Sequence, residues 1–113
     1  MTIARGDIVT AAAAPYSAKP RPVLVIQNSA VATGESVVII PFTSQANPAV
    51  ETRVEVQPTT ANGLNRQCWL EVDKVSAIRS SSIGESVGVI EPQLLTEVEV
   101  QLALLLGLPM PSE

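Results

Sequence analysis

The 113-residue sequence contains no histidine, one cysteine and only three aromatic residues. Without histidine, the chain cannot form the common zinc sites, a Ser-His or Cys-His nucleophile system, or imidazole acid–base catalysis. The lone Cys68 excludes an internal disulfide and favours an intracellular, cytoplasmic protein. The sequence has no apolar run of roughly 18 residues and no secretory-type apolar segment near Met1, so we expect no contact with a membrane.

Charged residues are also few, at 16%, whereas hydrophobic residues make up 46%. This balance excludes a wholly disordered chain and predicts a single globular domain over 1–113. Seven lysines and arginines against eleven acidic residues give a net charge of −4. The protein as a whole is therefore not expected to attract nucleic acid, although a local basic patch is compatible with this charge.

Strand patterns dominate the first ninety residues. The prolines Pro20 and Pro22 lack donors and predict that their end of a strand lies at a sheet edge or in a loop, and Pro41 should end the hydrogen-bond ladder of its strand. Apolar and polar residues alternate over residues 52–57, which predicts that Val54 and Val56 point inward and Arg53 outward. The expected strands are residues 6–11, 20–27, 36–43, 52–57, 68–73 (continuing toward Ile78) and 85–90.

One helix is predicted from Glu91 to Leu106, with Pro92 at its first position and Gly107 and Pro109 as its stop. Its apolar stripe is longer than one small core needs. Residues 109–113 are expected to form a flexible tail. Strands followed by one helix predict a mainly β fold, with a strongly curved or half-closed antiparallel sheet and the helix plugging one end. The stripe consists of Leu94, Leu95, Val98, Leu102 and Leu105.

Two segments offer groups that can bind phosphate. Arg21 lies between prolines that stiffen its backbone, and a planar guanidinium binds phosphate oxygens bidentately. Taken alone, Arg21 is better explained as a charge that protects a sheet edge. Thr43, Ser44 and Gln45 follow a buried strand and can donate to a phosphate, or they can form an ordinary turn.

Asp73 and Lys74 are expected at a strand end, with Glu71 on the same strand face. Asp73 is a candidate general base, or this segment is a solvated strand edge. Two aromatic residues could stack on a base: Tyr16 is the better candidate, and Trp69 is expected in a core or an interface. Cys68 has no histidine partner and is expected to be a small buried hydrophobic residue.

The ordered segments resemble one family, the MazF/PemK toxins of bacterial type II toxin–antitoxin systems. The resemblance is carried by residues 5–9 (RGDIV), 19–25 (KPRPVLV), 40–45 (IPFTSQ), 72–75 (VDKV) and 104–108 (LLLGL). It implies an SH3-like β-barrel of the CcdB/PemK/MazF type with a C-terminal helix. It also implies a sequence-specific endoribonuclease that cuts single-stranded RNA without a metal or another cofactor, leaving 2′,3′-cyclic phosphate and 5′-hydroxyl ends.

The resemblance also implies roles for individual residues. Arg21 and Thr43 take the places of the family's catalytic arginine and threonine, and Asp73 matches an aspartate that some members use as a base. The sequence departs from the pattern at Glu71, where those members carry an arginine. We expect five further residues to contact RNA, namely Tyr16, Lys19, Ser44, Gln45 and Lys74.

The partners implied by the resemblance are a second copy of the chain and an antitoxin whose acidic disordered tail occupies the RNA groove. Contact with DNA is expected only through the antitoxin. Two other functions remain open at this point: a toxin of the CcdB type that traps gyrase, and a catalytically inactive SH3-like binding module. The first is disfavoured because the chain's only tryptophan, Trp69, lies far from its C-terminus.

Overall fold

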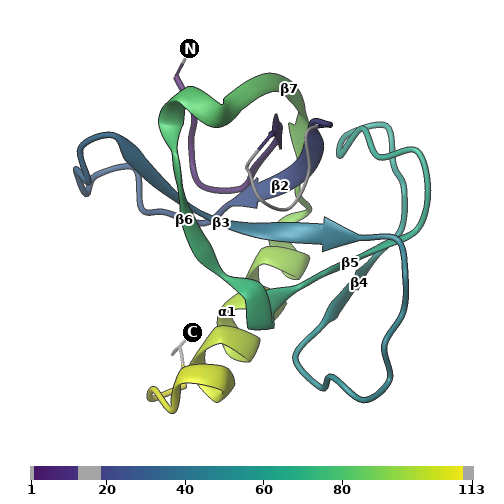
Figure 1. Ribbon diagram of the computed structural model, residues 1–113. Coiled ribbons are helices and arrows are strands. Elements are labelled where there is room, and N and C mark those ends of the chain that lie inside the picture. The colour runs from purple at the N-terminus through teal and green to yellow at the C-terminus, as the bar shows by residue number, and fades with distance from the viewer. Residues whose placement is uncertain (1, 13–18, 111–113) are drawn as a thin grey trace.

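The computed structural model describes residues 2–12 and 19–110. In these residues the chain forms seven strands, two short 3-10 helices and one α-helix (Figure 1). The elements in chain order are β1 (Asp7–Ala11), β2 (Arg21–Val25), β3 (Ser36–Thr43), β4 (Val54–Val56), β5 (Cys68–Leu70), η1 (Val72–Lys74), β6 (Ser76–Arg79), η2 (Ser80–Ser82), β7 (Ile83–Val89) and α1 (Pro92–Leu106).

The sheet runs in the order β4-β5-β3-β2-β1-β7, and every pairing in its described part is antiparallel. The long strand β3 holds the sheet together. One of its edges pairs with β2, and the other pairs first with β6 and then with β5. Because η2 leads from β6 directly into β7, these two strands bend around one face of the sheet. The mainly β fold with a C-terminal helix is thus confirmed.

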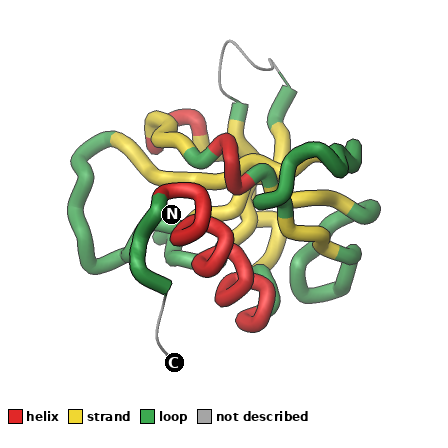
Figure 2. The backbone as a smooth tube through the Cα atoms, turned by 90° about the horizontal axis from the view of Figure 1, so that it is seen from below, coloured by secondary structure: helices red, strands yellow, loops and turns green. Residues whose placement is uncertain are grey.

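Two apolar cores lie on the two faces of this sheet. The helix-side core includes Ile8, Leu24, Ile40 and Leu70 together with Val98 of α1. Figure 2 shows α1 lying across the strands on that side. The barrel-side core is enclosed by β6 and β7 and consists of Val9, Ala11, Val23, Val25, Val37 and Ile39, with Ile3, Ile78 and Ile83 against them. Alternation along each strand sends neighbouring side chains into different cores.

The helix agrees with its prediction at both ends. Glu91 precedes it, Pro92 opens it, and Gly107 closes it with a φ of 69° while its N–H donates to Ala103 and Leu104. The apolar stripe is only partly buried, however, because Leu105 is 39% exposed. Within the predicted tail, residues 111–113 lie outside the described part of the chain.

The segment after Cys68 differs from its prediction. The expected continuous strand is interrupted: β5 ends at Leu70, η1 follows, and β6 begins at Ser76. Asp73 and Lys74 therefore lie in a 3-10 turn and not at a strand end. The break arises because β5 and β6 pair with different parts of β3, and η1 connects them.

The ladder of β3 with β2 ends at Pro41, as expected, although the strand continues to Thr43. The missing N–H of Pro41 falls between the β6 partners, which stop at Ile39, and the β5 partners, which start at Phe42. Two smaller expectations were shifted or wrong. The last strand is Ile83–Val89 rather than residues 85–90. Arg53 does not point into solvent, since its side chain is only 10% exposed. Within the described part of the chain, no helix has the length and apolarity needed to cross a membrane.

Candidate active site

The candidate residues Arg21 and Thr43 lie at the start of β2 and at the end of β3, which are paired strands. Their antiparallel ladder ends where Val23 lies opposite Pro41. Arg21 and Thr43 each lie two residues beyond that pair, and alternation puts both on the face that carries the barrel-side core. Among the described residues Arg21 is paired with Ala11 of β1, and it is exposed, so its guanidinium can reach a ligand. Lys19 is exposed two residues before it.

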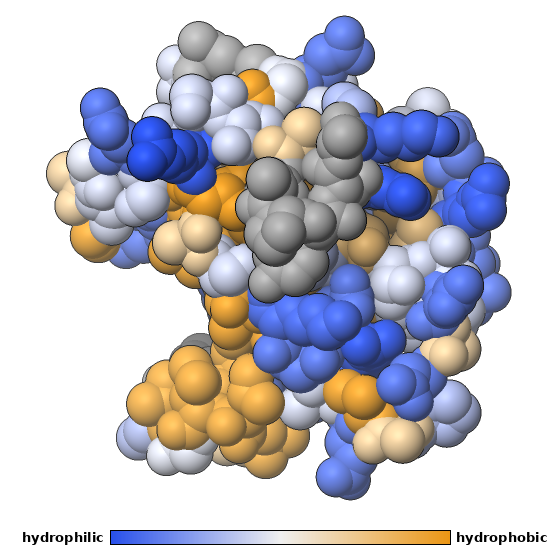
Figure 3. All heavy atoms as spheres, in the orientation of Figure 1, coloured by the Kyte–Doolittle hydropathy of each residue, from blue (hydrophilic) through white to orange (hydrophobic). Residues whose placement is uncertain are grey.

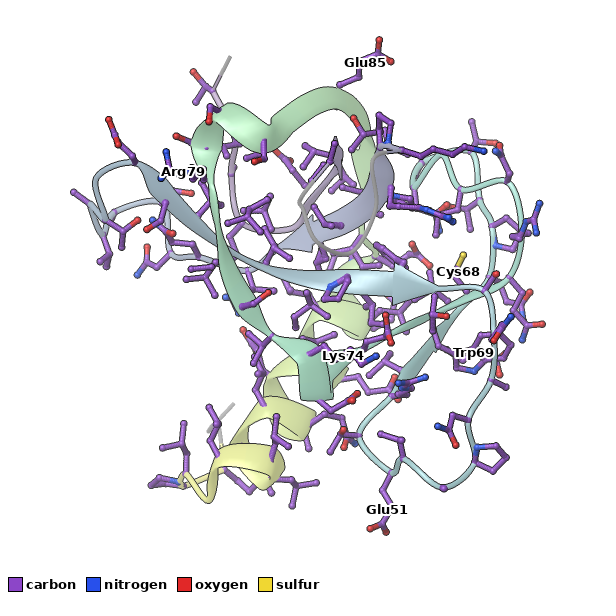
Figure 4. The ribbon with its side chains drawn as sticks, in the orientation of Figure 1. Glu51, Cys68, Trp69, Lys74, Arg79 and Glu85 are labelled. Atoms are coloured by element: carbon purple, nitrogen blue, oxygen red, sulfur yellow. The ribbon has the colours of Figure 1, made fainter. Side chains whose placement is uncertain are left out.

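A row of side chains runs from Thr43 across the next two strands. Thr43 lies opposite Trp69 of β5, and Trp69 lies opposite Glu55 of β4. Residues opposite each other in antiparallel strands share a face, so Thr43, Trp69 and Glu55 form one row across three strands. Trp69 is half-buried in this row. Figure 4 shows it near the tip of β3.

The hydroxyl of Thr43 is both locally fixed and chemically available. Its Oγ1 accepts a hydrogen bond of 3.2 Å from the backbone N–H of Gln45. This is the ordinary turn contact that the sequence allowed as an alternative. A hydroxyl that accepts one bond retains its own O–H as a donor, so Thr43 can still donate to a phosphate oxygen. Ser44 and Gln45 are exposed in the loop that follows.

Asp73 lies beside this row, in η1. The backbone N–H of Glu71 donates to the carbonyl of Pro41 at 2.9 Å, which places the start of η1 two residues from Thr43 along β3. Lys74 is 59% exposed, and Figure 4 shows it at the η1 turn, below the arrow of β3. Asp73 and Lys74 therefore lie on a turn that is bonded to β3 near Thr43, while Lys19 and Arg21 lie at the start of β2. Tyr16 lies outside the described residues.

One residue of this region was missed by the sequence analysis. Arg53, just before β4, extends across to η1 and contacts two carboxylates. Its Nη2 lies 3.1 Å from Oε2 of Glu71, and its Nε donates to Oδ1 of Asp73 at 3.4 Å. Lys74 Nζ also lies 3.3 Å from Oε2 of Glu71. The negative charges of Glu71 and Asp73 are thus compensated by the positive charges of Arg53 and Lys74.

Two other features lie apart from this region. Cys68 is buried as predicted, and burial raises the pKa of its thiol, although Arg66 partly opposes the effect. A shallow cleft of about 550 Å³ lies at the opposite end of β3, lined among others by Ile3, Val31 and Ile83. None of the candidate residues lines it. Among the described residues, no group of three histidine, cysteine or acidic side chains could hold a metal.

Comparison with known proteins identifies the family. The sequence model of the family described as "PemK-like, MazF-like toxin of type II toxin-antitoxin system" matches residues 4–106. The chain belongs to this family. A relative named "Probable endoribonuclease MazF" from Mycolicibacterium smegmatis is 38% identical over 105 residues, covering 92% of this chain and 96% of the relative.

Solved structures of this toxin family share the fold. A MazE–MazF complex from Deinococcus radiodurans matches with a TM-score of 0.78 and 22% identity, covering 96% of this chain and 100% of that one. The Mycobacterium tuberculosis toxin MazF-mt6 matches with a TM-score of 0.77 and 22% identity, covering 91% and 98%. A mycobacterial endoribonuclease in complex with its cognate antitoxin matches with a TM-score of 0.75 and 23% identity, covering 96% and 97%.

Proposed function

We propose that this MazF/PemK-family chain is a toxin that cleaves single-stranded RNA at specific short sequences without a metal ion. The observation that supports the proposal is the pairing of β2 with β3, because the exposed Arg21 and Thr43 lie just beyond the same end of this ladder, and Asp73 lies on the turn that follows β5. The 38% identical relative is named as an endoribonuclease, and this name supports the same activity here.

The proposed reaction uses the RNA's own 2′-hydroxyl as nucleophile. Its oxygen forms a bond to the adjacent phosphorus, and the bond from phosphorus to the 5′ oxygen breaks, which leaves a 2′,3′-cyclic phosphate and a 5′-hydroxyl. Asp73 or a water molecule takes the 2′-hydroxyl proton. A guanidinium does not give up its proton, so Arg21 is neither a base nor the final proton donor; it stabilises the charge that develops on the phosphate, and the leaving oxygen takes a proton from water.

Thr43 supplies a neutral donor for the same phosphate. Its Oγ1 is held by Gln45 N–H, which fixes the direction of its O–H. A prearranged donor of this kind contributes on the order of 10²–10³ in rate when it is aimed at the developing charge. Lys19, Lys74, Ser44 and Gln45 line the approach and bind the neighbouring RNA backbone, and Tyr16 stacks on a base.

Two protein partners belong to the proposal. The first is an antitoxin whose acidic disordered tail binds across Arg21 and its neighbouring cations, so that antitoxin and RNA compete for one surface. Related structures contain such toxins in complex with a cognate antitoxin. The second is another copy of this chain, which would cover the exposed apolar end of α1. Figure 3 shows this end as a continuous apolar patch, formed by Leu104, Leu106, Leu108 and Met110.

End-group analysis tests the activity. Purified protein is incubated with a long single-stranded RNA in EDTA, beside Arg21→Ala and the matched control Arg79→Ala, whose arginine is exposed on β6. We expect cyclic phosphate and 5′-hydroxyl ends from the wild-type protein and the control, and none from Arg21→Ala. Intact RNA with folded, antitoxin-free protein would contradict the proposal. A supercoiling assay would then distinguish a gyrase-directed toxin from an inactive module.

A second measurement tests the base and the competition. Full activity in Asp73→Asn would show that water takes the proton. For the antitoxin, an acidic peptide in place of the tail should displace a non-cleavable RNA from the protein. Simultaneous binding of both at saturating concentrations would overturn the shared surface.

A further inference from the structure

Arg53 is the one arginine of the described chain whose side chain is nearly buried next to the candidate active site. Only 10% of this side chain is exposed, against 12% for Glu71 and 24% for Asp73. A guanidinium that has been removed from water requires close acidic partners, and Arg53 has two within 3.4 Å. Its position is therefore set by these two carboxylates and not by solvent.

The two contacts differ in what they do for the carboxylates. Glu71 also receives Lys74 at 3.3 Å, so its charge is compensated twice. Asp73 receives a single N–H, from Arg53 Nε to Oδ1. Within the part of the chain that the structure describes, no other side chain is bonded to the Asp73 carboxylate. Among the described residues, Arg53 thus fixes the orientation of this carboxylate through Oδ1 and leaves Oδ2 as an acceptor.

The backbone beneath Asp73 offers little orientation of its own. Asp73 lies in a three-residue 3-10 turn, where no side-chain cap is formed at Glu71. An aspartate on so short a turn would otherwise move among its rotamers and be repelled by Glu71, two residues earlier. The guanidinium holds both carboxylates at fixed places and cancels their mutual repulsion.

We propose that Arg53 is a positioning residue for catalysis, which aims the Asp73 carboxylate at the 2′-hydroxyl of the RNA through the bond from Nε to Oδ1. The inference rests on the proposed function, since it requires Asp73 to take a proton during RNA cleavage. Arg53 itself does not touch the RNA, because its donors are directed at Glu71 and Asp73 and its side chain is nearly buried.

A double-mutant cycle tests the proposal, with a single-stranded RNA that carries a cleavage site mapped by the end-group experiment. Arg53→Gln should lower kcat on the order of 10²-fold, with a much smaller change in KM, because a misplaced catalytic group acts on the chemical step. In the Asp73→Asn background, Arg53→Gln should change kcat by less than about twofold. Arg79→Gln, which removes the same charge at the other end of β6, should behave as wild type.

The cycle separates positioning from a merely structural role. If Arg53 only stabilises the fold, its replacement lowers kcat by the same factor in both backgrounds, and the proposal is overturned. An Arg53→Gln enzyme with wild-type kcat, or an Asp73→Asn enzyme with wild-type kcat, overturns it as well while leaving RNA cleavage intact. A wild-type protein that does not cut RNA overturns the proposed function and with it this role.

A second variant keeps the test decisive if Arg53→Gln does not fold. Arg53→Met combined with Glu71→Met replaces the buried ion pair by two apolar side chains of similar volume, an exchange that folded proteins often tolerate. This variant keeps Asp73 in the chain but removes the guanidinium that contacts its carboxylate. We expect this folded variant to have the same low kcat as Arg53→Gln. Wild-type kcat in the double variant would show that Asp73 needs no positioning by Arg53, and the proposal would fail.

Discussion

Asn62 is the fully buried polar residue of the described chain, and its replacement gives a sharp test of the structure. Its side chain makes four hydrogen bonds at 2.9–3.2 Å. Oδ1 accepts from the backbone N–H groups of Thr59 and Leu64, and Nδ2 donates to the carbonyl of Gln57 and to Oε1 of Glu91. One amide therefore ties the β4–β5 loop to the start of α1.

The cost of Asn62→Ala follows from these four bonds. Each net hydrogen bond contributes about 1 kcal/mol, and buried groups left without a partner cost as much or more. Water can reach some of the abandoned groups, since Thr59 is exposed. We therefore expect a loss of about 3 kcal/mol, a large part of the 5–15 kcal/mol that stabilises a typical domain. The melting temperature should fall by roughly 10 °C.

Urea denaturation followed by circular dichroism measures this loss. Asn65→Ala is the matched control, because Asn65 is an exposed asparagine in the same loop. Its free energy of unfolding should change by less than about 0.5 kcal/mol. A change below about 1 kcal/mol in Asn62→Ala would mean that the four bonds do not restrain the loop, and the reasoning would be wrong.

Three further predictions concern single positions. Arg53→Met alone should cost about 3 kcal/mol in urea denaturation, because it leaves two carboxylates facing each other, and adding Glu71→Met should recover most of that loss. Gly88→Ala should destabilise the fold by about 1–3 kcal/mol, since its Cβ would lie 2.4 Å from the carbonyl oxygen of Ala61. Cys68 should react slowly with iodoacetamide until urea is added, because burial raises the pKa of its thiol. As pH rises, the thiol ionises in the unfolded chain at a lower pH than in the folded protein. The free energy of unfolding should therefore fall as pH rises above the ordinary thiol pKa, and Cys68→Ala should not show this loss.

Local sequence patterns correctly predicted those strands and helix ends that depend on only a few neighbouring residues. The bounds of β3 and the end of α1 agree with the structure because a run of β-branched residues and a Gly-Pro stop act over a few neighbouring residues. Cys68 is buried, as its lack of a histidine partner had led us to expect. The path from Cys68 to Ile78 was not, since the break at η1 depends on which part of β3 each segment pairs with.

The active-site geometry depended even more on long-range pairing. Alternation correctly put Val54 and Val56 inside and predicted Arg53 outside. That side of the strand is covered by η1, whose carboxylates come from residues 18 to 20 positions later, so the outward-pointing arginine is nearly buried. No local pattern carries this information. The placement of Arg21 and Thr43 at the same end of two neighbouring strands likewise follows from the pairing of β2 with β3.

The salt dependence of RNA binding offers a last test, because it counts the cations that meet the phosphates. The chain carries a net charge of −4, yet the candidate site holds exposed cations at Lys19, Arg21 and Lys74. Arg53 should not contribute, since its side chain is only 10% exposed, whereas Lys74 is 59% exposed although it contacts Glu71. With about 0.7 counterions released per phosphate on single-stranded RNA, three contacts predict a slope near −2 in a plot of log binding constant against log salt concentration. The measurement uses a non-cleavable RNA and titrations between low and high salt. A slope steeper than about −4 would require more phosphate contacts than these three cations supply, and the assignment of the RNA contacts to Lys19, Arg21 and Lys74 would then be wrong.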